Sequence, residues 1–232
     1  MVVVGAGCIG SSVAEIFVRA GVYNLTIVDS DLFEVGNLSR HVLNMSNVGE
    51  FKEQSLCSHL NSLNPHANIK VINNTLTIDE ESKTNITLDK YDIIIDCTGE
   101  NSVLDVFQKV DFKKSHIIAS ISVGLGAKHL YLTIMSGNTF CFNSFYKSLS
   151  PYIQSERDLF DDYNLPRNGI GCWHPTFPAR SDDVWLAAAT AVKATENYII
   201  TKPEKTLSIV YEQRENDGLF EGYILVDKKE NG

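Results

Sequence analysis

Short apolar runs alternate with helical patterns along the first 125 residues. The apolar runs lie at 2–4, 25–28, 69–72, 93–95 and 117–121. Their nearly continuous apolar character is typical of strands that are buried on both faces of a parallel sheet. Between them, apolar residues recur at helical spacing in the segments 9–20, 56–63 and 103–110. This alternation predicts an α/β fold, with a mostly parallel sheet and helices on its faces.

The pattern changes after residue 124. Apolar runs at 129–135 and 139–145 surround a Ser136-Gly137-Asn138 turn and predict a β-hairpin, so antiparallel strands extend the sheet in the C-terminal half. Residues 147–180 are polar and aromatic without a clear period. A loop of this length inside a compact domain is usually functional or mobile.

A helix and two strands are predicted at the C-terminal end. Ser181 caps the helix, and an acidic pair in its first turn suits the positive end of the helix dipole. The strands follow at 207–211 and 223–226. We therefore divide the chain into a core at 1–146, an irregular crossover segment at 147–181, and a C-terminal helix with two strands at 182–232 that complete the same domain.

Composition narrows the class of protein. The chain has 232 residues, of which 44% are hydrophobic and 21% charged, which is typical of a soluble globular chain with one α/β domain. Its formal net charge is −9 and it has no Lys/Arg run, which argues against binding to nucleic acid or to anionic membranes. No apolar stretch approaches the roughly 20 residues that span a bilayer.

Cysteine usage predicts a cytoplasmic protein. The cysteines, at 8, 57, 97, 141 and 172, are odd in number and widely spaced, no Cys-x-x-Cys pair occurs, and no secretion signal is present. Four of them lie in apolar helix or strand patterns, where a small buried side chain is expected. Cys172 lies in the irregular segment and is considered separately.

A glycine-rich turn joins the first strand to the first helix. Gly5, Gly7 and Gly10 allow a tight turn and bring phosphates close to the free N–H groups of the helix N-terminus. Asp29 ends the next strand, about 20 residues later, where a carboxylate can accept hydrogen bonds from ribose hydroxyls. This pattern predicts a Rossmann-like nucleotide site, and most such sites bind NAD.

The following segment favours a triphosphate over NAD. Asn37, Arg40 and Lys52 follow the Asp29-Ser30-Asp31 run. Arg binds phosphate oxygens in a bidentate manner, and Lys acts on them as a point charge. A dinucleotide oxidoreductase has no use for this ordered set of residues.

These motifs resemble those of the ThiF family, which comprises the adenylation domains of ubiquitin-activating enzymes and the sulfur-carrier adenylyltransferases. The resemblance runs from residue 2 to about residue 125. It is carried by the glycine motif at 5–10, Ile27–Asp31, Asn37–Arg40, Gly49–Lys52, Asn64-Pro65 and Asp96–Thr98. It implies that the three glycines border ATP, that Asp29 holds the ribose, and that Asn37, Arg40 and Lys52 line the phosphates. Asp31 and Asp96 are assigned to the same site, and the core at 1–146 becomes an ATP-binding adenylation core.

The implied reaction is the activation of a C-terminal carboxylate. The carboxylate of a ubiquitin-like protein, or of another peptide, attacks the α-phosphate of ATP, and pyrophosphate leaves. Arg40 and Lys52 stabilise the charge that develops, which is catalysis by positioning and electrostatics. Magnesium normally assists such a reaction.

One departure from the family pattern concerns magnesium. The family commonly has Asp-Cys-Thr-Asp-Asn after the fourth strand, whereas Gly99 and Glu100 follow Thr98 in this chain. Three alternatives follow: Glu100 substitutes with its longer reach, Asp96 shares the metal, or activity is weakened. The residue that binds the metal is therefore left open.

Cys172 is the candidate nucleophile of a second step. It follows Gly171 in the irregular segment, and His174, Arg167 or Arg180 could lower the pKa of its thiol. In thioester-forming relatives the catalytic cysteine also lies beyond the adenylation core. Cys172 is therefore expected to accept the activated carboxylate as a thioester and pass it to a conjugating partner.

Two alternatives and two further expectations remain. The chain could be a family member that adenylates without thioester chemistry or acts on another substrate, or a catalytically silent dimer partner. The resemblance implies a homodimer. The chain begins directly at its first strand, where relatives carry a helix or a fused domain, so a fragment of a longer protein is expected.

Overall fold

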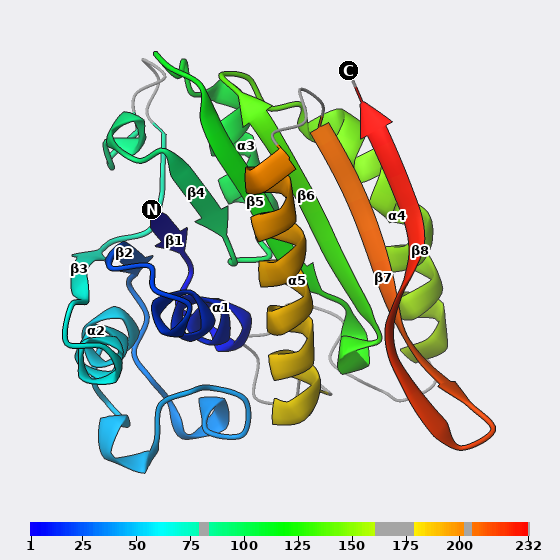
Figure 1. The fold of residues 1–232 in the computed structure, drawn as a ribbon, viewed down its shortest axis with the longest axis horizontal. Helices are drawn as coiled ribbons and strands as arrows, with labels where there is room; N and C mark the ends of the chain where they lie inside the picture. Colours follow the sequence, from blue (N-terminus) through cyan, green and yellow to red (C-terminus); the bar gives the residue numbers. More distant parts are fainter. Residues whose placement is uncertain (79–83, 161–178, 202–205, 232) are drawn as a thin grey trace.

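One mixed sheet forms the centre of the protein, and helices cover both of its faces (Figure 1). The computed structural model describes residues 1–78, 84–160, 179–201 and 206–231. The sheet has eight strands in the order β3-β2-β1-β4-β5-β6-β7-β8. Strands β1 to β5 run parallel to one another, and β6, β7 and β8 are each antiparallel to their neighbours.

The parallel half matches the expected pattern element by element. Its strands are β1 (Val2–Val4), β2 (Asn24–Asp29), β3 (Asn68–Asn73), β4 (Ile93–Asp96) and β5 (His116–Val123). Its helices are α1 (Cys8–Arg19), α2 (Lys52–Leu63) and α3 (Asn101–Lys109). Short 3-10 turns lie between these elements: η1 (Val35–Asn37), η2 (Met45–Asn47), η3 (Leu88–Lys90) and η4 (Leu125–Ala127). The α/β fold class predicted from the sequence is confirmed.

The C-terminal half differs from the expected pattern at one element. Strand β6 (His129–Gly137) pairs with β5 and with β7 (Thr206–Asn216), so the predicted hairpin partner at 139–145 is wrong. Helix α4 (Phe142–Phe160) begins there instead and occupies part of the segment predicted to be irregular. Pro151 lies inside α4, and a proline at that position disguises a helical pattern in the sequence.

At the C-terminal end the helix begins where it was expected, and the two strands are longer than expected. Helix α5 (Ser181–Thr201) begins at the predicted cap. Strands β7 and β8 (Leu219–Asn231) form a long antiparallel ribbon around a turn at Asp217-Gly218, with irregular pairing near Tyr211 and Glu215. The ribbon extends past the apolar runs into exposed residues near the turn, most of which are polar, although Leu219 and Phe220 are exposed apolar residues.

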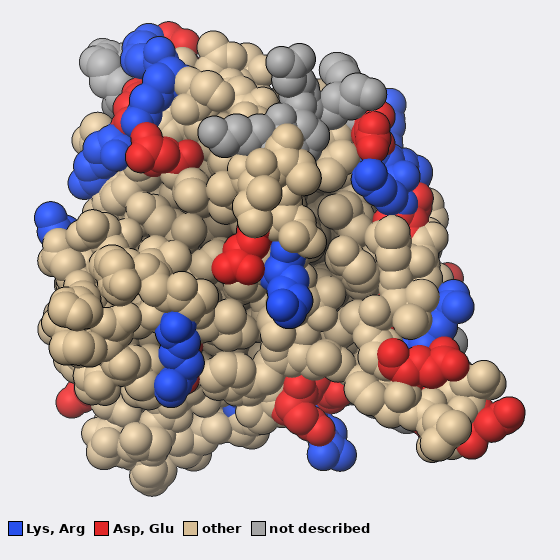
Figure 2. Space-filling model, in the orientation of Figure 1, with Lys and Arg blue, Asp and Glu red and all other residues tan. Residues whose placement is uncertain are grey.

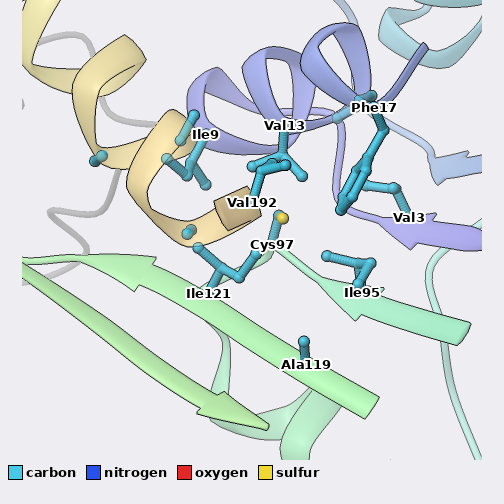
Figure 3. Packing of buried hydrophobic residues seen from close by; sticks show 14 of the residues in the cluster. Val3, Ile9, Val13, Phe17, Ile95, Cys97, Ala119, Ile121 and Val192 are labelled. Atoms are coloured by element: carbon cyan, nitrogen blue, oxygen red, sulfur yellow. The ribbon is translucent and has the colours of Figure 1, made fainter. Parts of the chain in front are cut away.

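Two hydrophobic clusters hold the layers together. One joins the sheet to α1, α2 and α5, and the other joins the opposite face to α3 and α4. In the first, Cys97 at the end of β4 lies among Ile9, Val13 and Val192, below α1 and α5 (Figure 3). Burial raises the pKa of the Cys97 thiol well above its usual value, which makes Cys97 a packing residue.

The remaining described cysteines differ in their exposure to solvent. Cys8 is buried and Cys57 is half-buried, but Cys141 is exposed, because the strand predicted around it does not form. The prediction of a buried Cys141 is therefore wrong. None of the helices in the described part of the chain is long and apolar enough to cross a bilayer.

Candidate active site

A cleft of about 610 Å³ lies at the carboxyl ends of the parallel strands. Ligands of open α/β sheets bind at this edge, where strand order reverses direction around the first strand. Here β1 lies between β2 and β4, so the loops after these three strands meet. The lining residues are Gly5, Gly7, Cys8, Ile9, Asp29, Ser30, Asp31, Leu32, Glu34, Asn37, Lys52, Cys97, Thr98 and Glu100.

The glycine turn forms one wall of the cleft. Gly5 has a φ of +91°, a conformation that L side chains rarely adopt. Gly7 precedes α1 as its N-cap and makes no side-chain cap, so the first N–H groups of α1 face the cleft without a capping side chain. Such an N-terminus favours an anion. The turn predicted from the sequence is therefore present, with two of its three glycines lining the cleft.

Gly10 has a different role from Gly5 and Gly7. It does not line the cleft, but a Cβ placed on it would lie 2.0 Å from the carbonyl oxygen of Gly5 and 3.1 Å from the Cβ of Cys97. The absence of a side chain lets α1 pack closely against the turn and against β4. Gly10 thus shapes the site through the packing of α1, without lining the cleft itself.

Asp29 joins the glycine turn to the end of β2. Its Oδ2 accepts a hydrogen bond from the Ala6 N–H at 2.6 Å, and its Oδ1 accepts one from the Asp31 N–H at 2.8 Å. Each carboxylate oxygen has further acceptor capacity, which a ribose hydroxyl can use. Burial raises the pKa of Asp29, although these two backbone hydrogen bonds oppose the shift.

Lys52 brings a positive charge to the floor of the cleft. Only 5% of its side chain is exposed, and its Nζ donates to Asp31 Oδ2 at 2.9 Å. The Asp31 side chain is 62% exposed, so the pair points a cation inward and an anion outward. The Lys52 N–H also donates to the Asp31 carbonyl oxygen at 2.9 Å, which ties the start of α2 to the end of β2.

Asn37 also lines the cleft. Its Oδ1 accepts a hydrogen bond from the Glu34 N–H at 2.9 Å, within the cap of η1. Because the carbonyl oxygen of the amide is used in this way, the NH2 group is the part of the side chain suited to donate to an anion. This orientation fits the predicted contact with phosphate.

Asp96 and Arg40 do not line the cleft. Asp96 is 1% exposed, and its carboxylate accepts hydrogen bonds from the Thr98 N–H (3.0 Å), the Thr98 hydroxyl (2.7 Å) and the Ser120 hydroxyl (2.8 Å). It therefore supports the wall that Thr98 forms. Arg40 is 3% exposed, and its backbone N–H donates to the Asn37 carbonyl oxygen at 3.1 Å. The direct phosphate contact expected of Arg40 stays a prediction.

The cleft is acidic overall. Asp29, Asp31, Glu34 and Glu100 line it, against the single cation Lys52 among the described lining residues. A triphosphate bound there needs a further positive charge. Magnesium takes oxygen ligands from one or two carboxylates together with phosphates, so this donor set fits it.

Glu100 is the lining carboxylate that follows β4. Its N–H donates to the Thr98 hydroxyl at 3.1 Å, which holds the turn around Gly99, whose φ is +67°. Among the alternatives left open for the metal, Glu100 lies at the cleft and Asp96 does not. In the described part of the chain, no three His, Cys, Asp or Glu side chains form a ready-made metal site.

Sequence reasoning missed several lining residues. Ser30, Leu32 and Glu34 follow β2, and Thr98 follows β4. Their positions directly after parallel strands were the available signal, because such positions meet at one edge of the sheet. Cys172 and its neighbours Arg167 and His174 lie outside the described residues.

The chain belongs to the ThiF family, whose profile matches residues 1–162. The resemblance seen in the sequence is thereby confirmed. A similar curated protein is the ATP-dependent ubiquitin transferase-like protein Cap2 of Enterobacter hormaechei subsp. hoffmannii, 38% identical over 197 residues, which cover 83% of this chain and 32% of Cap2. The molybdopterin-synthase adenylyltransferase of Haemophilus influenzae is 34% identical over 118 residues, covering 50% of this chain and 46% of that protein.

Solved structures share the fold at low sequence identity. E. coli MccB, crystallised with AMPCPP and MccA, has a TM-score of 0.60 at 15% identity, covering 99% of this chain and 62% of MccB. E. coli tRNA N6-threonylcarbamoyladenosine dehydratase TcdA, in complex with AMP, has a TM-score of 0.59 at 17% identity, covering 87% and 86% of the two chains. The chain spans less than half the length of the two curated relatives above.

Proposed function

We propose that the chain activates a carboxylate by adenylation with ATP. The observation that carries this proposal is the convergence of Gly7, Asp29, Asn37 and Lys52 on one cleft at the N-terminus of α1. The family supports it, since curated relatives are named adenylyltransferases. A substrate carboxylate oxygen attacks the α-phosphorus of ATP, the bond to the bridging oxygen breaks, and pyrophosphate leaves.

The residues of the cleft have distinct parts in this proposal. Asp29 accepts hydrogen bonds from the ribose, while the N–H groups of α1 and the Asn37 amide donate to phosphate oxygens. Lys52 offsets the negative charge that grows on the leaving pyrophosphate, and Arg40 is proposed to do so as well. Glu100 would hold magnesium, which would supply further positive charge to the phosphates.

The proposal is tested first at the level of binding. Calorimetric titration with ATP and magnesium should show a single site, and NAD should bind far more weakly. Tighter binding of NAD than of ATP would overturn the assignment. The catalytic step is tested by ATP–pyrophosphate exchange in the presence of a ubiquitin-like protein that ends in glycine. Arg40→Ala should lose this exchange, and full exchange in that variant would remove Arg40 from the phosphate site.

The finer proposal is that the substrate is a ubiquitin-like protein and that Cys172 accepts it. The thiolate attacks the acyl carbon of the adenylate, the bond to the AMP oxygen breaks, AMP leaves, and the thiol proton passes to solvent. Helices α4 and α5, which precede and follow the segment carrying Cys172, support the proposed step on Cys172. Glu156 of α4 accepts a hydrogen bond from the Leu125 N–H at 3.2 Å, and α5 also contacts η4, which follows β5 at the edge that carries the cleft.

The thioester step has its own test. Cys172→Ala should keep ATP–pyrophosphate exchange but lose an adduct that thiols cleave, and Cys141→Ala is the matched control because Cys141 is exposed. An adduct that survives in Cys172→Ala would overturn the assignment of Cys172, and a wild type that forms no such adduct would limit the chain to adenylation. A homodimer and a conjugating enzyme as acceptor are also proposed. The homodimer is tested by the molar mass of the protein in solution, and the conjugating enzyme by transfer of the adduct to it.

A further inference from the structure

His41 is a buried residue that the proposed reaction does not yet use. Its Nδ1 accepts a hydrogen bond from the Leu43 N–H at 3.1 Å, and its Nε2 lies 2.7 Å from the Ala6 carbonyl oxygen. Because Nδ1 acts as an acceptor, the ring proton is on Nε2, which donates to Ala6. The edge of the ring packs against Phe33, with ring centroids 4.9 Å apart. Both nitrogens and the orientation of the ring are thus accounted for.

The partner of His41 is the centre of the glycine turn. The Ala6 N–H donates to Asp29 at 2.6 Å, and the Ala6 carbonyl oxygen accepts from His41, so the residue is held on both sides. The described peptide bonds are trans, and in a trans peptide the carbonyl and the next N–H point in opposite directions. The contact with His41 therefore also sets the direction of the Gly7 N–H, which begins the anion-binding end of α1.

We propose that His41 is a positioning residue that keeps the Gly7 N–H and the first turn of α1 directed at the phosphates of a bound nucleotide. It acts through the Ala6 carbonyl group and does not line the cleft. This inference rests on the proposed nucleotide site. It assigns a role to the residue that directly follows the Asn37–Arg40 motif.

Three variants separate the two hydrogen bonds of the ring. In His41→Gln the side-chain amide NH2 can replace Nε2–H as donor to Ala6, but no acceptor remains at the place of Nδ1. In His41→Asn the side-chain oxygen replaces Nδ1 as acceptor for Leu43, but the donor to Ala6 is lost. His41→Ala removes both. A role confined to the Leu43 turn is preserved by Asn, whereas the proposed role is preserved by Gln.

The readout is a ligand series measured by calorimetry on each variant: adenosine, AMP and ATP with magnesium. His41→Asn and His41→Ala should bind AMP and ATP about tenfold more weakly, as expected for one hydrogen bond at the upper end of its usual contribution, and should bind adenosine as before. His41→Gln should restore most of the phosphate affinity. Equal weakening of adenosine and ATP, or wild-type ATP binding by His41→Asn, would overturn the proposal.

A second measurement is independent of nucleotide. Amide hydrogen exchange at Gly7 and Cys8 should be faster in His41→Asn than in His41→Gln or in the wild type, and unchanged exchange would overturn the positioning role. If the wild type binds no nucleotide, the proposed function fails, and the exchange data alone then decide whether His41 orders the turn. If His41→Ala does not fold, the comparison between Asn and Gln carries the test.

Discussion

Gly10 provides a sharp test of how the site is built. A Cβ at this position would lie 2.0 Å from the Gly5 carbonyl oxygen, which is a backbone atom. The Gly5 backbone has little room to move, because its N–H donates to the Val28 carbonyl oxygen at 2.8 Å and the backbone and side chain of Thr98 close off its other side. Gly10→Ala must therefore displace α1 from the turn.

The expected size of this effect follows from comparison with other overpacked sites. Crowding of a packed interior costs about 1–3 kcal/mol, which outweighs the roughly 0.5–1 kcal/mol that Gly→Ala usually gains in a helix. For a chain of this length, about 1–3 kcal/mol lowers the melting temperature by about 2–12 °C. The assay is thermal and urea unfolding of the wild type and of Gly10→Ala.

Gly7→Ala is the matched control. It adds the same methyl group three residues earlier, at a glycine that lines the cleft, where no atom lies within 4 Å and φ is −72°. Its stability should fall by less than about 1 kcal/mol, the scale of a changed N-cap, while its affinity for ATP falls because the methyl group faces the cleft. A Gly10→Ala protein as stable as the wild type would refute the reasoning on close approach.

Three further predictions concern charged and titratable residues. The pKa of His41 is lowered to about 4, chiefly by burial, from its usual 6.5, so the unfolded state binds its proton first and stability is lost as pH falls from 6.5 towards 4. Urea unfolding should show about 2 kcal/mol of this loss between pH 8 and pH 5, and His41→Gln should not show it. Lys52→Ala should weaken ATP binding about tenfold to hundredfold, since a hydrogen bond to a charged group contributes about 1.5–3 kcal/mol, whereas Lys128→Ala should not change it. An equal loss in both lysine variants would show a general charge effect. Asp96→Ala leaves one buried and two partly buried donors without their acceptor and should lower the free energy of unfolding by about 1–3 kcal/mol in urea, a loss that wild-type stability in the variant would contradict.

The parallel half could be read from the sequence because its signals are local. A buried parallel strand is apolar on both faces, and each helix has an apolar stripe with a clear stop, as at Asn64-Pro65. The same reasoning failed for α4. Few of the α4 side chains that the structure describes are buried, Pro151 interrupts the pattern, and the aromatic residues around 140–145 have strand propensity.

The residues of the candidate site also divide into those that a local motif identified correctly and those whose side-chain direction it did not predict. Gly5, Gly7, Asp29 and Lys52 were found because each belongs to a short motif with its own chemistry, and all four line the cleft. Asp96 was assigned to the nucleotide site by its motif, yet its carboxylate is used by Thr98 and Ser120. A motif specifies a residue type at a position but not the direction of its side chain.

The sequence by itself determined the family, the succession of strands and helices in the parallel half, and the chemical groups that are proposed to bind ATP. Only the tertiary structure decided which of those groups face the cleft, that Gly10 shapes it through the packing of α1, and that His41 holds the Ala6 carbonyl group. The physical reason is that these contacts join residues far apart in the chain, such as Ala6 and His41. Their partners are chosen when the loops after β1, β2 and β4 meet at one edge of the sheet.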